Sequence, residues 1–183
     1  MTATNRLMSD IGFKFMSLMF KVRDLIRPRL DVLNEAGIES GFSVLDFGCG
    51  PGGYIMPLLE LVGPSGKIFA LDIHPLAIRE IKNMATRKGI ENIVTIESDC
   101  SSGLPNNDVD TILLYDVFHD LAHPDKVLRE LHRVLKPGGT LSFSDHHMKE
   151  DEVLTRLTSA GMFQYVRKGK KTYSFTKINS GQE

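Results

Sequence analysis

Blocks of apolar and polar residues alternate along this chain and predict strands and helices in turn. Short, nearly continuous apolar runs are typical of parallel strands covered on both faces, and apolar residues at helical spacing lie between them. The predicted strands are 44–47, 67–72, 93–96, 109–115 and 140–145, the helices are 52–62, 75–88, 124–135 and 151–160, and a hairpin of 163–167 and 171–175 turns about Gly169. The sequence therefore predicts an α/β fold: a Rossmann-like, doubly wound, seven-stranded sheet, mostly parallel with an antiparallel strand from the C-terminal hairpin.

An amphipathic helix is predicted before the first strand. Apolar residues recur there at helical spacing, at Ile11, Phe15, Leu18, Val22 and Leu25, while charged residues interrupt any run long enough to span a bilayer. Three interpretations stay open: a helix packed on the domain, a membrane-surface segment, or an apolar lid over an active site. The lid would use Phe13, Phe15, Met16, Met19 and Phe20.

A glycine-rich turn follows the first strand and is the strongest sign of a ligand site. Gly48, Gly50 and Gly53 fit the dinucleotide pattern G-x-G-x-x-G, which brings a pyrophosphate onto backbone N–H groups. Two neighbours oppose a pyrophosphate, because Asp46 adds a negative charge and Pro51 lacks an N–H. A ligand that carries positive charge fits this turn better.

The series Asp46-x-Gly48-x-Gly50-x-Gly52 resembles motif I of the class I S-adenosylmethionine-dependent methyltransferases. Further segments resemble later motifs in family order: 67–72 with its terminal acid, residues 99–100, 110–116, and the helix and turn 128–139. The resemblance covers roughly residues 42–177. It divides the chain into an N-terminal helical lid or extension (1–40), a methyltransferase domain (41–178) and a short tail (179–183).

The resemblance also assigns cofactor-binding roles. It implies that Asp72 binds the two ribose hydroxyls and that Asp99 and Cys100 recognise adenine through a side-chain oxygen and a backbone N–H. The implied set for S-adenosylmethionine, or its product S-adenosylhomocysteine, is Asp46, Gly48, Cys49, Gly50, Gly52, Asp72, Ile73, Asp99, Cys100 and Asp116.

Four of the six histidines lie at the carboxyl ends of two predicted strands, where open α/β sheets bind their ligands. His119 and His123 follow residues 109–115, and His146 and His147 follow residues 140–145. A neutral imidazole can accept a proton near pH 7, so His119 and His146 are candidates for a catalytic base or substrate anchor. An alternative is a Zn or Fe(II) site made of His119, His123, Asp145 and His146 or His147.

Sequence differences from related enzymes narrow the range of acceptors. The chain resembles the quinone and arsenite methyltransferases, but only residues 146–151 separate the fifth strand from the next helix, which leaves out the usual substrate-covering insertion. Asp116-Val117-Phe118-His119 replaces the Asn-Pro-Pro-Tyr of enzymes that methylate amino groups of bases or glutamine, and two cysteines are too few to hold arsenite. We therefore expect an enzyme that transfers a methyl group to a small-molecule acceptor. The alternatives are a metal-binding or regulatory module that senses the donor and, with less support, an RNA methyltransferase.

Composition restricts the partners and the compartment. The chain has 183 residues and a formal net charge of −1, which gives no bulk attraction to nucleic acid or anionic membranes. The basic cluster at residues 167–171 is interpreted as a solvated loop. The chain shows no signal-peptide layout, no transmembrane segment is expected, and two cysteines indicate reduced thiols and a cytoplasmic setting. Oligomeric state is left undetermined by the sequence.

Overall fold

The computed structural model describes Gly12 and residues 29–178. The strands are β1 (Ser43–Phe47), β2 (Lys67–Asp72), β3 (Ile93–Glu97), β4 (Val109–Tyr115), β5 (Leu135–Ser144), β6 (Phe163–Lys168) and β7 (Tyr173–Lys177). The helices are α2 (Leu30–Glu35), α3 (Ile55–Val62), α4 (Pro75–Lys88), the 3-10 turn η1 (Phe118–Asp120), α5 (Pro124–Val134) and α6 (Glu150–Thr158). The predicted N-terminal amphipathic helix and lid, and the tail from residue 179, lie outside the described residues.

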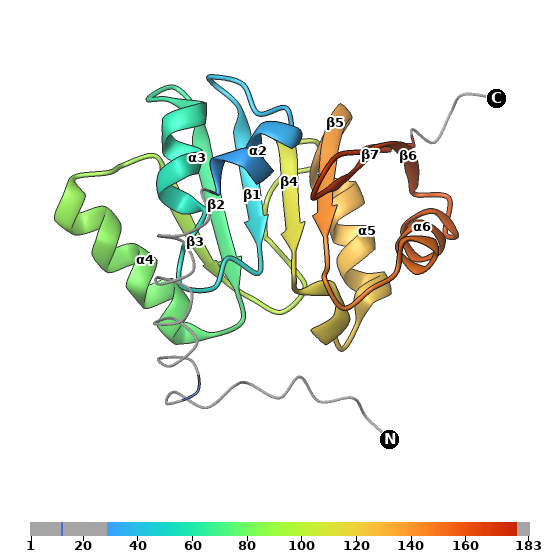
Figure 1. Cartoon of the computed structure of the whole chain (residues 1–183). Coiled ribbons are helices and arrows are strands. Elements are labelled where there is room, and N and C mark those ends of the chain that lie inside the picture. The colour runs from blue at the N-terminus through green and yellow to red at the C-terminus, as the bar shows by residue number, and fades with distance from the viewer. Residues whose placement is uncertain (1–11, 13–28, 179–183) are drawn as a thin grey trace.

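The seven strands form one sheet in the order β3-β2-β1-β4-β5-β7-β6 (Figure 1). Strands β1 to β5 are parallel to one another, and β7 is antiparallel to both of its neighbours, β5 and β6. This confirms the predicted fold class. Strand order reverses between β1 and β4, which puts the carboxyl ends of these two strands at the switch point where ligands bind in such sheets.

Helices cover both faces of the sheet because side chains on each strand alternate between two cores. On β4, Ile112 and Leu114 join the core that contains α5 and α6, while Leu113 and Tyr115 join the core that contains α2, α3 and Ile81 of α4. Such a strand is buried on both sides, which explains why its sequence is continuously apolar. None of the helices between residues 29 and 178 is long and apolar enough to span a bilayer.

Several predicted bounds differ from the observed ones. Helix α3 begins at Ile55 instead of residue 52, because Gly52 has φ +83 and its carbonyl accepts the Ile55 amide in a turn. Strand β5 begins at Leu135, which pairs with Val109 before the register shifts, so the predicted turn at 136–139 is the irregular start of the strand. Helix α6 spans Glu150–Thr158 instead of 151–160 and follows Lys149 in extended conformation.

The turn between β6 and β7 is held by α2, while its four basic residues are exposed, as expected of a solvated loop. The Glu35 carboxylate accepts hydrogen bonds from the amides of Lys170, Lys171 and Thr172 and from the Thr172 hydroxyl. Burial acts to raise the pKa of Glu35, but these bonds outweigh it, and the pKa lies below its ordinary value. Strand β6 is one residue longer than the predicted 163–167, and β7 lies two residues later than the predicted 171–175. The Gly169 amide donates to the Thr172 carbonyl and closes the turn.

Candidate functional site

The glycine turn leaves β1 with three residues in the left-handed region. Gly48, Gly50 and Gly52 have φ of +79, +51 and +83, a conformation that glycine adopts without steric cost. The amides of Gly48 and Cys49 both donate to the Leu71 carbonyl, at 2.8 and 2.9 Å, which bends the turn toward the end of β2.

Close packing fixes two of these glycines, and no described residue crowds the third. A Cβ at Gly48 would lie 2.8 Å from Val117 Cγ2, and one at Gly52 would lie 2.9 Å from Ile81 Cγ1. Among residues 29–178, a Cβ at Gly50 would meet nothing within 4 Å. The turn is thus anchored on both sides, while the backbone at Gly50 borders space that no described residue fills and that a ligand could occupy.

Asp72 joins the end of β2 to this turn. One of its carboxylate oxygens accepts the Gly50 amide and the other accepts the His74 amide, both at 2.8 Å. Burial raises the pKa of Asp72 above its ordinary value. His74 is itself buried and caps α4, with its Nδ1 accepting the Leu76 amide. Ile73 lies between these two fixed residues, so the backbone carrying the predicted ribose acid is rigidly placed.

Asp46 is a buried carboxylate with an unsatisfied oxygen. The residue is 2 % exposed, and within the described part of the chain its Oδ2 has no hydrogen-bond partner. Burial raises its pKa to about 7, against the opposing field of Arg29. A buried carboxylate oxygen at a glycine turn suits a ligand that brings an ammonium or another cation. The site therefore fits S-adenosylmethionine, which carries a sulfonium and an ammonium but no phosphate.

Arg29 lies across the same turn and was missed by the sequence analysis. Its guanidinium stands 4.2 Å from the centre of the Tyr54 ring and directly over Gly53, where a Cβ would collide with it. Tyr54 packs edge-on against Tyr115, whose hydroxyl shares a 2.7 Å hydrogen bond with Ser142. Arg29 precedes the motif by many residues and reaches it only through tertiary packing, so no spacing rule could have marked it.

The predicted adenine-binding residues lie in the loop after β3. Asp99 is exposed and Cys100 is half-buried. The Ser98 hydroxyl accepts the amides of Cys100 and Ser101, at 3.4 and 3.1 Å, and holds the loop in a tight turn. Burial and the Asp99 carboxylate raise the pKa of the Cys100 thiol. Their role toward adenine stays a prediction.

The carboxyl ends of β4 and β5 bring together the strand-end histidines. Asp145 is buried, and its carboxylate accepts the amides of His119 and His147 and lies 2.9 Å from His119 Nδ1. Burial acts to raise the pKa of Asp145, but these hydrogen bonds outweigh it and the pKa lies below its ordinary value. Asp116 Oδ1 accepts the His146 amide at 3.1 Å and lies 2.8 Å from His146 Nδ1.

Three imidazole rings pack against each other in this cluster. The ring centres of His119 and His147 are 4.2 Å apart, and those of His146 and His147 are 4.0 Å apart. His123 stands at the N-cap of α5 and makes no capping bond with its side chain. Among the described residues, Asp116, Asp145 and His146 form the one group of ligand atoms compact enough for a metal. This group shares Asp145 and His146 with the predicted metal set, adds Asp116, and leaves out His119 and His123. Metal binding itself stays a prediction.

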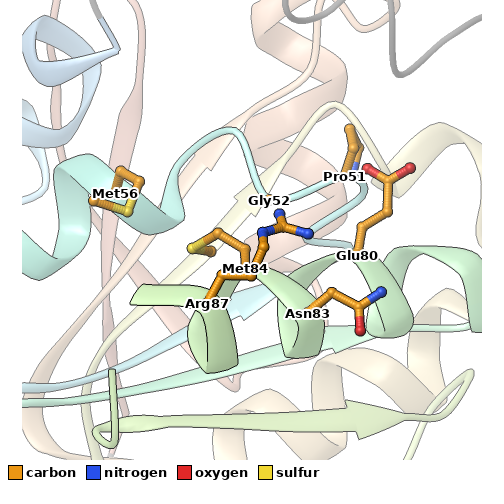
Figure 2. Close-up of a pocket in the computed structure, with 7 residues that line it drawn as sticks. All are labelled: Pro51, Gly52, Met56, Glu80, Asn83, Met84 and Arg87. Carbon is orange, nitrogen blue, oxygen red and sulfur yellow. The ribbon is translucent and has the colours of Figure 1, made fainter. Parts of the chain in front are cut away.

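A separate groove of about 320 Å³ runs along the outer side of the glycine turn. Figure 2 shows Glu80, Asn83, Met84 and Arg87 standing on α4, with Met56 on α3 and Pro51 and Gly52 in the turn. Helix α4 packs on β2 and β3, so this groove lies on the opposite side of β1 from the histidines of β4 and β5.

Comparison with known proteins settles the family. The sequence profile of the family described as "Methyltransferase domain" matches residues 38–178. The chain belongs to this methyltransferase-domain family. Demethylmenaquinone methyltransferase of Geobacillus stearothermophilus is 28% identical over 125 residues, which are 68% of this chain and 53% of that protein. The ubiquinone/menaquinone biosynthesis C-methyltransferase UbiE of Hahella chejuensis is 32% identical over 111 residues, 60% of this chain and 45% of that one. The methyltransferase-domain chain thus spans about half the length of these curated relatives.

Solved structures agree on the fold. A SAM-dependent methyltransferase from Aquifex aeolicus superposes with a TM-score of 0.71 at 28% identity, covering 86% of this chain and 96% of that one. A protein from Methanococcus maripaludis, described as a putative S-adenosyl-L-methionine-dependent methyltransferase, has a TM-score of 0.78 at 16% identity and covers 96% of this chain and 99% of its own. The second likeness shows the fold alone.

Proposed function

We propose that this protein transfers a methyl group from S-adenosylmethionine to a small-molecule acceptor. The observation that carries the proposal is the buried Asp46 oxygen, which no described residue satisfies, beside a glycine turn that the described residues leave open, in a chain of the methyltransferase-domain family. When bound, S-adenosylmethionine supplies an electrophilic methyl group on a positively charged sulfur.

Different residues around the glycine turn would bind different parts of the donor. Asp72 would bind the ribose diol, and the loop at Asp99 and Cys100 would bind adenine, as the resemblance implies. Asp46 and Arg29 both border the turn and are oppositely charged when Asp46 is ionised. Asp46 would therefore attract the ammonium and Arg29 the carboxylate of the amino-acid group. Gly48, Cys49, Gly50, Gly52 and Ile73 contribute backbone to this cradle.

Asp116 stays a predicted donor contact, although its carboxylate is bonded to His146. It follows β4 directly, and β4 pairs with β1, which leads into the glycine turn, and with β5, which leads into His146 and His147. This position suits a residue that borders both the donor and the acceptor.

His119 is the better placed of the two candidate bases. The Asp145 carboxylate can only accept, so the His119 Nδ1 carries the proton that bonds to it, and Nε2 is left with the lone pair. Nε2 lies 3.3 Å from the exposed Asp120 carboxylate, which would stabilise the imidazolium once a proton is taken up. Asp145 thus orients His119 as a general base for an acceptor O–H or N–H, and His146 would anchor the acceptor.

The names of the relatives suggest the first acceptors to test. Quinone precursors are the substrates implied by the names of the Geobacillus and Hahella proteins, and a reduced quinone is a planar, oxygenated ring. The short connection between β5 and α6 leaves the histidine cluster exposed to such a ring. Both cysteines are free thiols, and a cytoplasmic location stays our prediction.

The test is turnover against a panel of hydroquinones, phenols, thiols and amines, with formation of S-adenosylhomocysteine as the readout. We expect at least one class to give product that depends on His119. Binding of the donor with no product from any class would favour the alternative, a module that senses the donor without consuming it.

A further inference from the structure

We propose that the carboxyl ends of β4 and β5 bind one divalent transition-metal ion of the Zn²⁺ or Fe²⁺ type through Asp116, Asp145 and His146. Each residue offers one ligand atom, and the three atoms lie within 4.8 Å of one another. Asp116 comes from the end of β4, whereas Asp145 and His146 follow β5. The pairing of these strands as far as Tyr115 and Ser144 sets the two ligand-bearing ends side by side.

The donor set suits such an ion. One imidazole nitrogen and two carboxylates match the preferences of Zn²⁺ and Fe²⁺, whereas Mg²⁺ prefers oxygen ligands alone. Metal–ligand bonds of about 2.0–2.2 Å place neighbouring ligand atoms roughly 3.0–3.5 Å apart. His146 Nδ1 and Asp116 Oδ1 are already 2.8 Å apart, and their side chains are 68% and 38% exposed, which leaves room for the rotation that coordination needs.

Asp145 forms the fixed side of the site. Its side chain is 0% exposed and receives N–H donors from the His119 amide, the His147 amide and the His119 ring. A carboxylate has about four acceptor positions, so one remains for a metal. Such bonds to a ligating carboxylate orient it, and their loss typically weakens metal affinity about 10–100-fold.

The backbone of Asp116 is also fixed in place. Its φ of +52 lies in the left-handed region, which aspartate and asparagine tolerate better than most residues. The Asp116 amide donates to the Ser144 carbonyl at 2.7 Å and ties the turn to the end of β5. This bond sets the first carboxylate next to the residues that carry the other two ligands.

A metal at this position would lie on the acceptor side of the proposed methyl-transfer site. A coordinated hydroxyl of the acceptor would lose its proton more readily, because the cation stabilises the oxyanion. Only this catalytic role of the metal rests on the proposed function, because metal binding itself can be measured without donor or acceptor.

The test is titration of the tag-free, full-length protein with Co²⁺, followed by visible absorption, and with Zn²⁺ by calorimetry after chelator treatment. We expect one ion per chain and at least about tenfold weaker binding in Asp116→Asn and His146→Ala. Asparagine keeps the tolerance for positive φ at position 116, and His146 is exposed, so both variants should stay folded, as circular dichroism will check. His123→Ala is the matched control and should bind as the wild type does.

Three results would overturn the proposal: no saturable binding, a stoichiometry well below one, or equal affinities in His146→Ala and His123→Ala. Parallel calorimetry with S-adenosylhomocysteine separates the two proposals. Binding of the nucleoside without the metal would overturn the metal site alone, and binding of the metal without the nucleoside would overturn the proposed function alone.

Discussion

Asp145 binds His119 through both the backbone and the ring of the histidine. Asp145 Oδ2 lies 3.1 Å from the His119 amide nitrogen and 2.9 Å from its Nδ1. The two residues are 26 positions apart and meet because β4 and β5 are parallel neighbours. The pair fixes both the position and the tautomer of one imidazole at the strand ends where an acceptor would enter.

The His119 ring should matter for transfer and not for donor binding. We expect His119→Ala to lower the single-turnover rate by about 10²–10⁴-fold, because a general base of this kind contributes that much. Affinity for S-adenosylhomocysteine should stay within about twofold. His123→Ala, which removes an imidazole that makes no capping bond, is the control. An unchanged rate in His119→Ala would remove it from the mechanism.

Arg29 should recognise the amino-acid part of the donor alone. We expect Arg29→Met to weaken S-adenosylhomocysteine at least about tenfold, since a charged hydrogen bond is worth about 1.5–3 kcal/mol. Affinity for 5′-methylthioadenosine, which lacks the amino-acid group, should be unchanged. Asp72→Asn should weaken both ligands, because both carry the ribose. Equal losses for both ligands in Arg29→Met would contradict the assignment.

Replacing the Asp46 carboxylate should stabilise the fold while harming binding. Its pKa is raised from 3.8 to about 7 by burial, so the native state favours the protonated form. Folding stability from this group is complete below pH 3.8 and is lost as the pH rises to about 7. Asp46→Asn should therefore be more stable than the wild type at pH 8, by about 1–4 kcal/mol, with the gap closing toward pH 4.

Urea unfolding at the two pH values measures this gap, and calorimetry should show weaker binding of S-adenosylhomocysteine in the same variant. Glu91→Gln removes an exposed charge before β3 and should change neither property. If Asp46→Asn were less stable than the wild type at pH 8, the claim that burial of the Asp46 carboxylate destabilises the fold would be contradicted.

Glu130 should behave in the opposite way. It accepts the amide and hydroxyl of Ser102 and pairs with Arg133, and its side chain is 12% exposed. Burial acts to raise its pKa, but the hydrogen bonds outweigh this and lower it to about 2. Its contribution is present above the ordinary value of 4.5 and is lost as the pH falls toward 2. Glu130→Gln should cost about 1–3 kcal/mol at pH 7 and less at pH 3, by urea unfolding. An equal cost at both pH values would contradict the ionised role.

Local signals predicted some elements to the residue. Strand β2, helix α4 and strand β4 have the predicted bounds. Helix α4 begins at Pro75, which suits the first turn, and ends before Gly89, whose φ of +63 caps it. Strand β5 was predicted too short because Pro137-Gly138-Gly139 reads as a turn, yet Leu135 pairs with Val109 across the sheet. Pairing between residues far apart in the sequence cannot be predicted from the local sequence.

The candidate site also contains residues that local sequence motifs predicted and residues that only tertiary packing brings in. Asp46 and the three glycines lie in one contiguous motif, and Asp72 ends the next predicted strand, so motif order pointed to all of them. Arg29 and the contact of Glu35 with the β6–β7 turn depend on how α2 packs, and α2 carries no distinctive motif. Both Asp116 and His123 follow β4, and the contact of the Asp116 carboxylate with His146 depends on how the ends of β4 and β5 meet, which the sequence does not show.

Titration of the wild-type protein with S-adenosylhomocysteine by calorimetry tests the central claim most directly. The account predicts one site per chain with a dissociation constant in the micromolar range, and loss of that site in Asp72→Asn but not in Glu91→Gln. No measurable heat with this nucleoside, or saturable binding of NAD in its place, would contradict a donor held at the glycine turn by Asp46 and Asp72.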